Sequence, residues 1–124
     1  MEVKFDTKTT YTVITPVAGV LDKDVTAKLA EVTAQDYGGD SNNFIIDLQY
    51  CKSADNTSLF SLRQVHDACY TARRSFVLTG LQAELRQTLQ NNDETSALNM
   101  APTMEEAIDI ISMEILERDL LSEE

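Results

Sequence analysis

The fold is decided by one short stretch of the chain, Phe44-Ile45-Ile46-Asp47-Leu48. Nearly continuous apolar runs of this length are typical of central strands that are buried on both faces of a sheet. After a brief loop comes Asp55-Asn56-Thr57-Ser58, a dense cluster of helix-capping residues. The cluster stands just ahead of an apolar stripe at helical spacing, and the two stretches together predict a buried strand followed by a helix. The stripe consists of Leu59, Leu62, Val65, His66 and Cys69.

Toward the amino end, the sequence predicts a hairpin and then a helix. Residues 3–17 contain alternating and β-branched segments separated by a polar stretch, which is the pattern of two paired strands. The sequence leaves open whether residues 1–8 pair within the sheet or swap to another chain. Asp22 or Asp24 can cap a helix that continues until Gly38-Gly39 stops it.

Toward the carboxyl end, the pattern alternates again. Residues 75–79 predict a strand, 81–89 a short helix and 97–100 an edge strand. Thr103 and Glu106 have the spacing of a capping box and predict the start of a last helix.

The complete order, ββαβαβα(β)α, predicts an α/β fold with a four- to five-stranded mixed sheet and about four helices. A chain of 124 residues has the size of one ordinary domain, so we expect residues 1–124 to form a single domain. We expect the polar residues from about 119 onward to be disordered.

Charge and composition exclude several classes of function. The net charge of −11, from 21 acidic and 10 basic residues, argues against direct binding of nucleic acid or anionic membrane surfaces. No signal peptide is evident and no stretch approaches the roughly 20 apolar residues of a membrane span, so we expect a cytoplasmic protein without membrane insertion. Two separated cysteines indicate reduced thiols rather than a disulfide framework. We expect neither a cofactor nor a metal ion, because the sequence has no dinucleotide or phosphate-binding motif and no zinc spacing.

Four segments, in this order, carry a resemblance to a known family. They are Gly19-Val20-Leu21-Asp22, Ile45-Ile46-Asp47-Leu48, Asp55, and the start of the last helix at Thr103-x-Glu105-Glu106-Ala107. In this order and at these spacings the chain resembles the STAS family of anti-sigma factor antagonists and the related sulfate-transporter regulatory domains. The resemblance covers almost the whole chain and implies the STAS fold.

The resemblance also implies a site, at the position of the family's Asp-Ser-Ser-Gly motif. Here that motif reads Asp55-Asn56-Thr57-Ser58, so the phosphoacceptor position is held by Thr57, with Ser58 as the second choice. The glycine that lets a partner approach the backbone is replaced by Ser58. The partner-binding residues that we expect are Asp22, Tyr50, Asp55, Asn56, Thr57 and Ser58.

The function implied by the resemblance is partner switching in bacterial signalling and transcription regulation. The unphosphorylated protein would bind an anti-sigma factor with serine/threonine kinase activity, phosphorylation of Thr57 would end that binding, and a PP2C-type phosphatase would restore it. No catalytic residue is then needed in this chain, which would not be an enzyme. A homodimer is compatible with the same role.

Other interpretations of these residues stay open. Asn56, Thr57 and Ser58 can simply cap a helix, and a cap is compatible with a phosphoacceptor. A degenerate STAS domain could instead serve, without phosphorylation, as a scaffold or as a regulatory subunit of a transporter or signalling complex. A small enzyme would require a pocket around His66, Cys69 or the aspartates, with titrating groups of shifted pKa. His66 and Cys69 share a helix face, but the sequence offers no third catalytic partner.

Overall fold

The structure is a computed structural model that describes residues 1–122. Its strands and helices follow in an order that alternates after an initial hairpin. The elements are β1 (Glu2–Thr7), β2 (Thr12–Val17), β3 (Val20–Leu21), α1 (Lys23–Thr33), the 3-10 helix η1 (Gly39–Asn42), β4 (Phe44–Asp47), β5 (Ser53–Ala54), the 3-10 helix η2 (Asn56–Ser58), α2 (Leu59–Thr71), β6 (Phe76–Thr79), α3 (Ala83–Gln90) and α4 (Met104–Ser122).

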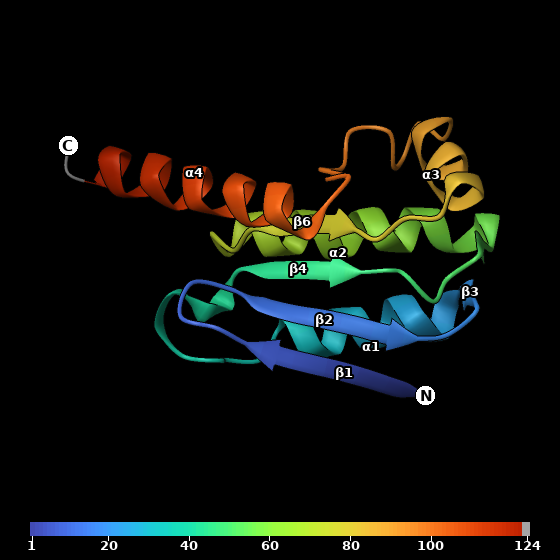
Figure 1. The fold of residues 1–124 in the computed structure, drawn as a ribbon, viewed down its shortest axis with the longest axis horizontal. Helices are drawn as coiled ribbons and strands as arrows, with labels where there is room; N and C mark the ends of the chain where they lie inside the picture. The colour runs from blue at the N-terminus through green and yellow to red at the C-terminus, as the bar shows by residue number, and fades with distance from the viewer. Residues whose placement is uncertain (123–124) are drawn as a thin grey trace.

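A mixed four-stranded sheet in the order β1-β2-β4-β6 forms the middle of the molecule (Figure 1). β1 and β2 are antiparallel, with Glu2 opposite Val17 and Thr7 opposite Thr12, whereas β2, β4 and β6 are parallel. The predicted hairpin is therefore confirmed, and residues 2–7 pair with their own chain. The α/β class and the mixed sheet are confirmed as well.

The core lies on both faces of β4. Phe44 and Ile46 belong to the larger apolar cluster, under α1 and α2, whereas Ile45 belongs to a second cluster with residues of α4. All three side chains are completely buried. A strand that faces helices on both sides has no polar face, which is why its sequence is a continuous apolar run.

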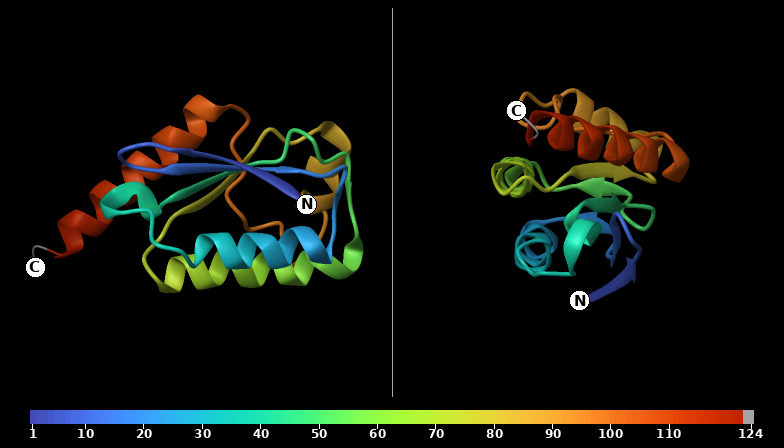
Figure 2. Two further views of the ribbon diagram at one scale, coloured as in Figure 1. Left: turned by 90° about the horizontal axis from the view of Figure 1, so that it is seen from below. Right: turned by 90° about the vertical axis from the view of Figure 1, so that its left-hand side faces the viewer.

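The helices form a layer on each side of the sheet. α1 and α2 lie side by side on one face and α4 crosses the other (Figure 2). Arg74, just after α2, donates from Nη1 to the carbonyl oxygens of Thr33 and Gln35 at 2.9 and 2.7 Å. It thereby satisfies carbonyl groups that the end of α1 leaves without helical partners.

The sequence-based elements differ from the structure in several places. β3 and β5 were not predicted, because strands of two residues carry no periodic pattern. The predicted strand at 97–100 is a single bridge between Leu78 and Met100. α1 ends at Thr33, before the glycines, and η1 occupies part of the stretch that was expected to be a loop.

α4 extends beyond the edge of the sheet (Figure 1). It continues to Ser122, so residues 119–122 are helical where the sequence predicted disorder; the rest of that prediction, Glu123 and Glu124, lies outside the described residues. Arg118 ties the projecting part to the sheet by donating to Asn43 Oδ1 at 2.7 Å and Ser75 Oγ at 3.1 Å. Within residues 1–122, no helix combines the length and the apolar character that crossing a bilayer requires.

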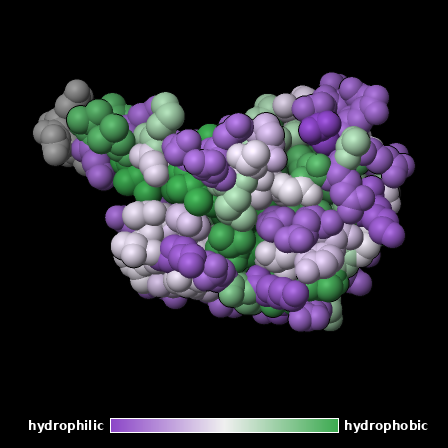
Figure 3. Space-filling model, in the orientation of Figure 1, coloured by the Kyte–Doolittle hydropathy of each residue, from purple (hydrophilic) through white to green (hydrophobic). Residues whose placement is uncertain are grey.

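Apolar side chains gather on the projecting end of α4 (Figure 3). Each of the four that are most exposed there leaves more than half of its surface open to solvent. They are Met113, Leu116, Leu120 and Leu121.

Candidate functional site

A short parallel ladder joins the starts of two helices. β3 pairs with β5, and the ladder is extended by backbone hydrogen bonds from Lys52 N to Gly19 O at 2.8 Å and from Asp55 N to Leu21 O at 2.9 Å. α1 begins directly after β3, and η2 with α2 begins directly after β5. The amino ends of α1 and α2 therefore lie at the same end of the molecule (Figures 1 and 2).

Each helix start is capped by an aspartate that the sequence singled out. Asp22 is the N-cap of α1, and its Oδ1 accepts from Val25 N at 3.1 Å. Asp55 is the N-cap of η2, and its Oδ1 accepts from Thr57 N at 3.2 Å. A carboxylate at such a position satisfies an otherwise unpaired N–H and is favoured by the helix dipole.

Thr57 lies on the surface at the first turn of η2. Its side chain is exposed, as are those of Asp55 and Asn56. Thr57 Oγ1 donates to Asp55 Oδ2 at 3.0 Å, so one carboxylate binds both the backbone and the hydroxyl of Thr57. The hydroxyl is thus accessible and held in one orientation at the start of a helix.

Ser58 does not share this surface. Its exposed fraction is 0% and its hydroxyl has no hydrogen-bond partner within the described part of the chain. Ser58, which the sequence suggested as a second phosphoacceptor and as a partner-contacting residue, therefore has a side chain that neither a kinase nor a partner reaches in the folded domain. Within the capping cluster, the accessible hydroxyl is that of Thr57.

Replacing Ser58 with alanine tests this burial. Ser58→Ala is expected to leave the free energy of unfolding unchanged or raise it by up to about 1 kcal/mol, because it removes a desolvated polar group that gains no hydrogen bond. Urea denaturation with matched m-values measures the change. Thr57→Ala is the control, and it should lower stability by about 0.5–1.5 kcal/mol through loss of the bond to Asp55. A loss above about 1 kcal/mol in Ser58→Ala would show that the hydroxyl has a partner.

Tyr50 is exposed but is engaged elsewhere. It lies in the loop between β4 and β5, where Lys4 Nζ is 3.4 Å from its hydroxyl and 5.4 Å from its ring centre. The structure therefore brings Asp55, Asn56 and Thr57 together on the surface and places Tyr50 against β1.

Two apolar residues at this end of the molecule were missed by the sequence reasoning. Val20, in β3, is 44% exposed and Phe60, in the first turn of α2, is 55% exposed. Val20 belongs to the strand whose backbone binds Asp55, and Phe60 follows Ser58 by two residues. Phe60 does not belong to the apolar stripe that predicted α2. A large apolar residue off the buried face of a helix was the sequence signal that could have identified it. We define the switch surface as Val20, Asp22, Asp55–Thr57 and Phe60.

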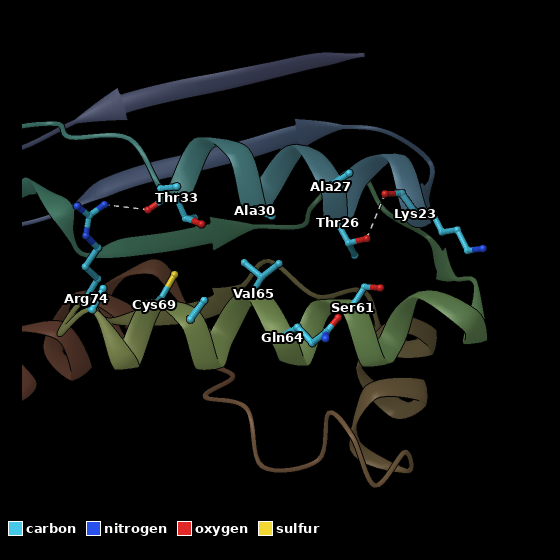
Figure 4. Close-up of a pocket in the computed structure, with 13 residues that line it drawn as sticks. Lys23, Thr26, Ala27, Ala30, Thr33, Ser61, Gln64, Val65, Cys69 and Arg74 are labelled. Carbon is cyan, nitrogen blue, oxygen red and sulfur yellow. Dashed lines mark hydrogen bonds between the residues drawn. The ribbon is translucent and has the colours of Figure 1, made fainter.

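A hollow lies along α1 and α2 rather than at Thr57 (Figure 4). It is a groove of about 610 Å³ lined mainly by small side chains, among them Ala27, Ala30 and Ala68. Cys69 also borders it, but burial raises the pKa of its thiol. Because the thiolate is the nucleophile, this thiol is held in its unreactive form.

The other groups that could support chemistry are also placed unfavourably. Burial, followed by the charge of Asp22, raises the pKa of Cys51 to about 11. His66 packs against the rings of Tyr70 and Phe76, and its Nδ1 lies 2.8 Å from Asp67 Oδ1. Among residues 1–122, no group of three or more His, Cys, Asp or Glu side chains is arranged to hold a metal ion.

The fold and the site define a small α/β domain whose exposed hydroxyl, carboxylates and apolar side chains gather where two helices begin. The family model of the STAS domain matches residues 4–107, and the chain belongs to this family. The resemblance seen in the four sequence segments is thereby confirmed.

Solved structures share the fold at low sequence identity. A substituted form of Moorella thermoacetica RsbS is 20% identical, with a TM-score of 0.70 over 95% of this chain and 99% of that one. The anti-sigma factor antagonist SpoIIAA in its unphosphorylated form is 17% identical, with a TM-score of 0.60 over 90% of this chain and 98% of that one. The phosphorylated form of the Bacillus cell fate determinant SpoIIAA is also 17% identical, with a TM-score of 0.59 over 89% of this chain and 99% of that one. No curated protein matches the sequence significantly.

Proposed function

We propose that this chain is a cytoplasmic, non-enzymatic binding module whose contact with a regulatory partner is controlled by phosphorylation of Thr57. The observation that carries the proposal is the exposed Thr57 hydroxyl, fixed by Asp55 at the start of a helix. It stands at the family's phosphoacceptor position. The exposed Val20 and Phe60 supply apolar contact area at the same end of the molecule.

Phosphate at Thr57 would change the surface without unfolding the domain. The modification replaces a hydroxyl donor by a group with about −1.5 to −2 charges. The group would stand beside the Asp55 carboxylate, so the present hydrogen bond would give way to repulsion. The positive end of the helix dipole at this position can accommodate the charge. An apolar partner surface would lose affinity, because it would have to desolvate the phosphate.

The partner that the family relationship suggests is an anti-sigma factor with serine/threonine kinase activity. It would bind the unphosphorylated surface and phosphorylate Thr57, thereby ending its own binding. A PP2C-type phosphatase would restore the hydroxyl. RsbS and SpoIIAA, whose folds are similar, support this choice, because SpoIIAA is an anti-sigma factor antagonist that exists in both forms.

Mass spectrometry of the protein isolated from its own cells, during growth and under stress, tests the proposal. The tryptic peptide 53–63 should carry a phosphate whose occupancy changes with condition, and fragmentation should place it on Thr57 rather than on a serine. Thr57→Val should abolish the modified peptide, whereas Ser58→Ala should retain it. An unmodified peptide under every condition, with the protein in a stable complex, would overturn the switch.

That last outcome would favour a second candidate, a non-phosphorylated scaffold or regulatory subunit of a transporter or signalling complex. The observation in its favour is the exposed apolar end of α4, since contiguous apolar surface commonly marks contact with another protein. Leu116→Ser with Leu120→Ser should release such a complex, whereas Thr57→Val should not.

A further inference from the structure

The outer edge of β1 carries backbone groups without partners in the sheet. Lys8 N donates to Tyr11 O at 2.8 Å where the hairpin closes. Because bonded and non-bonded pairs alternate along an antiparallel ladder, the even-numbered residues of β1 bond to β2. The N–H and C=O groups of Val3, Phe5 and Thr7 then point away from it. Pro16, which has no N–H, lies opposite Val3 and fits this assignment.

The side chains of this edge are charged in an alternating order. Along residues 2–8 the even positions are Glu2, Lys4, Asp6 and Lys8, so the strand is locally neutral within a chain of net charge −11. The odd positions lie on the other face of the pleat. Phe5 is among them; it is 46% exposed and stacks on Tyr37 at 6.3 Å between ring centres.

We propose that two copies of this chain pair antiparallel through β1, with Phe5 opposite Phe5 of the second copy. In this register Val3 faces Thr7, so the three outward residues of each copy form bonded pairs with each other. Lys4 faces Asp6 and Glu2 faces Lys8, all in non-bonded pairs, where cross-strand side chains approach most closely. The two sheets become one continuous eight-stranded sheet.

Charge selects this register over its neighbours. A shift that centres the pairing on Lys4 sets Lys4 against Lys4 and Glu2 against Asp6. A shift that centres it on Asp6 sets Asp6 against Asp6 and Lys4 against Lys8. Both alternatives place like charges directly opposite, which is unfavourable. Charged side chains on an edge strand usually prevent pairing, and here they disfavour both neighbouring registers.

The contacts inside one copy are compatible with the pairing. Lys8 Nζ lies 3.4 Å from Asp6 of its own strand, and Lys4 contacts the Tyr50 hydroxyl. An ammonium group has three donors, so Lys4 can keep Tyr50 and still reach Asp6 of the second copy. The pairing involves neither Thr57 nor its partner and is independent of the proposed function.

Sedimentation equilibrium on charge variants tests the inference. The wild type should show reversible dimerisation at concentrations up to about millimolar, and Lys4→Glu and Asp6→Lys should each raise the dimer dissociation constant at least about tenfold. Asp6→Lys is decisive, because it lowers the net negative charge and would strengthen association if overall repulsion were the main factor. The double variant Lys4→Glu/Asp6→Lys restores the pairs and should restore the dimer. Lys52→Glu, an exposed charge change away from β1, is the matched control.

Hydrogen exchange at single amides provides the second readout. On going from dilute to concentrated protein, the amides of Val3, Phe5 and Thr7 should become protected, whereas those of Lys4 and Asp6 should be protected throughout. A monomer at all concentrations overturns the proposal. A dimer that forms without protecting these amides, or that the double variant does not restore, overturns it as well.

Discussion

Thr57→Glu is expected to weaken binding of the proposed partner, an anti-sigma factor with serine/threonine kinase activity, by at least tenfold, about 1.4 kcal/mol or more. The new carboxylate would stand beside Asp55 where the hydroxyl now donates at 3.0 Å. A partner that covers this position would have to desolvate two neighbouring negative charges, and the Asp55 carboxylate would lose one of its two donors. Isothermal titration calorimetry with the purified kinase measures the change.

Thr57→Gln separates charge from size. Glutamine has the volume of glutamate without its charge, so it should weaken binding less than Thr57→Glu does. Thr57→Ser keeps the hydroxyl and should bind and be phosphorylated. Urea denaturation should show that all three variants remain folded, since the side chain of Thr57 makes a single exposed hydrogen bond within residues 1–122, to Asp55. Binding by Thr57→Glu that equals the wild type would contradict the switch.

The parts of the fold that could be predicted from the sequence are those with a local physical cause. The run 44–48 is apolar throughout because both faces of β4 are covered, and that cause is visible in one chain segment. The helix starts were recognised from short polar side chains that can accept from helix N–H groups, and the structure shows which of the candidates do so: Asp22 rather than Asp24, Asp55 within the cluster 55–58, and Thr103.

The parts that could not be predicted depend on contacts between distant segments. β3 and β5 are two residues long and exist because residues 19–22 and 52–55 meet. The burial of Ser58 has the same origin, because α1 packs against η2 as well as α2, and nothing in a run of four capping residues indicates which one faces inward. The sequence therefore indicated Asp55 and Thr57, which the structure places on the surface, but the sequence reasoning missed that Val20 and Phe60 are exposed beside them and that Ser58 is buried.

Gly80→Ala is expected to lower the free energy of unfolding by about 3 kcal/mol, through two separate costs. Gly80 follows β6 with φ at 71°, in the left-handed region that an alanine side chain disfavours. A Cβ at this position would also fall on Asp47 Oδ1 and lie 3.2 Å from Gln49 N. Asp47 Oδ1 accepts from Gln49 N at 3.1 Å, so the methyl group would displace a carboxylate from the turn that leads to Tyr50.

Two variants separate these costs. Gly80→Asn tolerates the left-handed conformation but still carries a Cβ, so it should recover only the conformational part of the loss. Gly19→Ala is the matched control, because a Cβ there meets nothing within 4 Å and its φ is not positive. Gly19→Ala should change the free energy of unfolding by no more than about 1 kcal/mol, and we expect it to stabilise the domain. The free energies of unfolding are measured by urea denaturation. If Gly80→Ala lowers this free energy no more than Gly19→Ala does, Asp47 moves aside freely. The β4–β5 loop would then lack the rigid attachment to β6 that the Asp47–Gln49 turn and the bond from Gln82 Nε2 to Gln49 O at 3.0 Å give it.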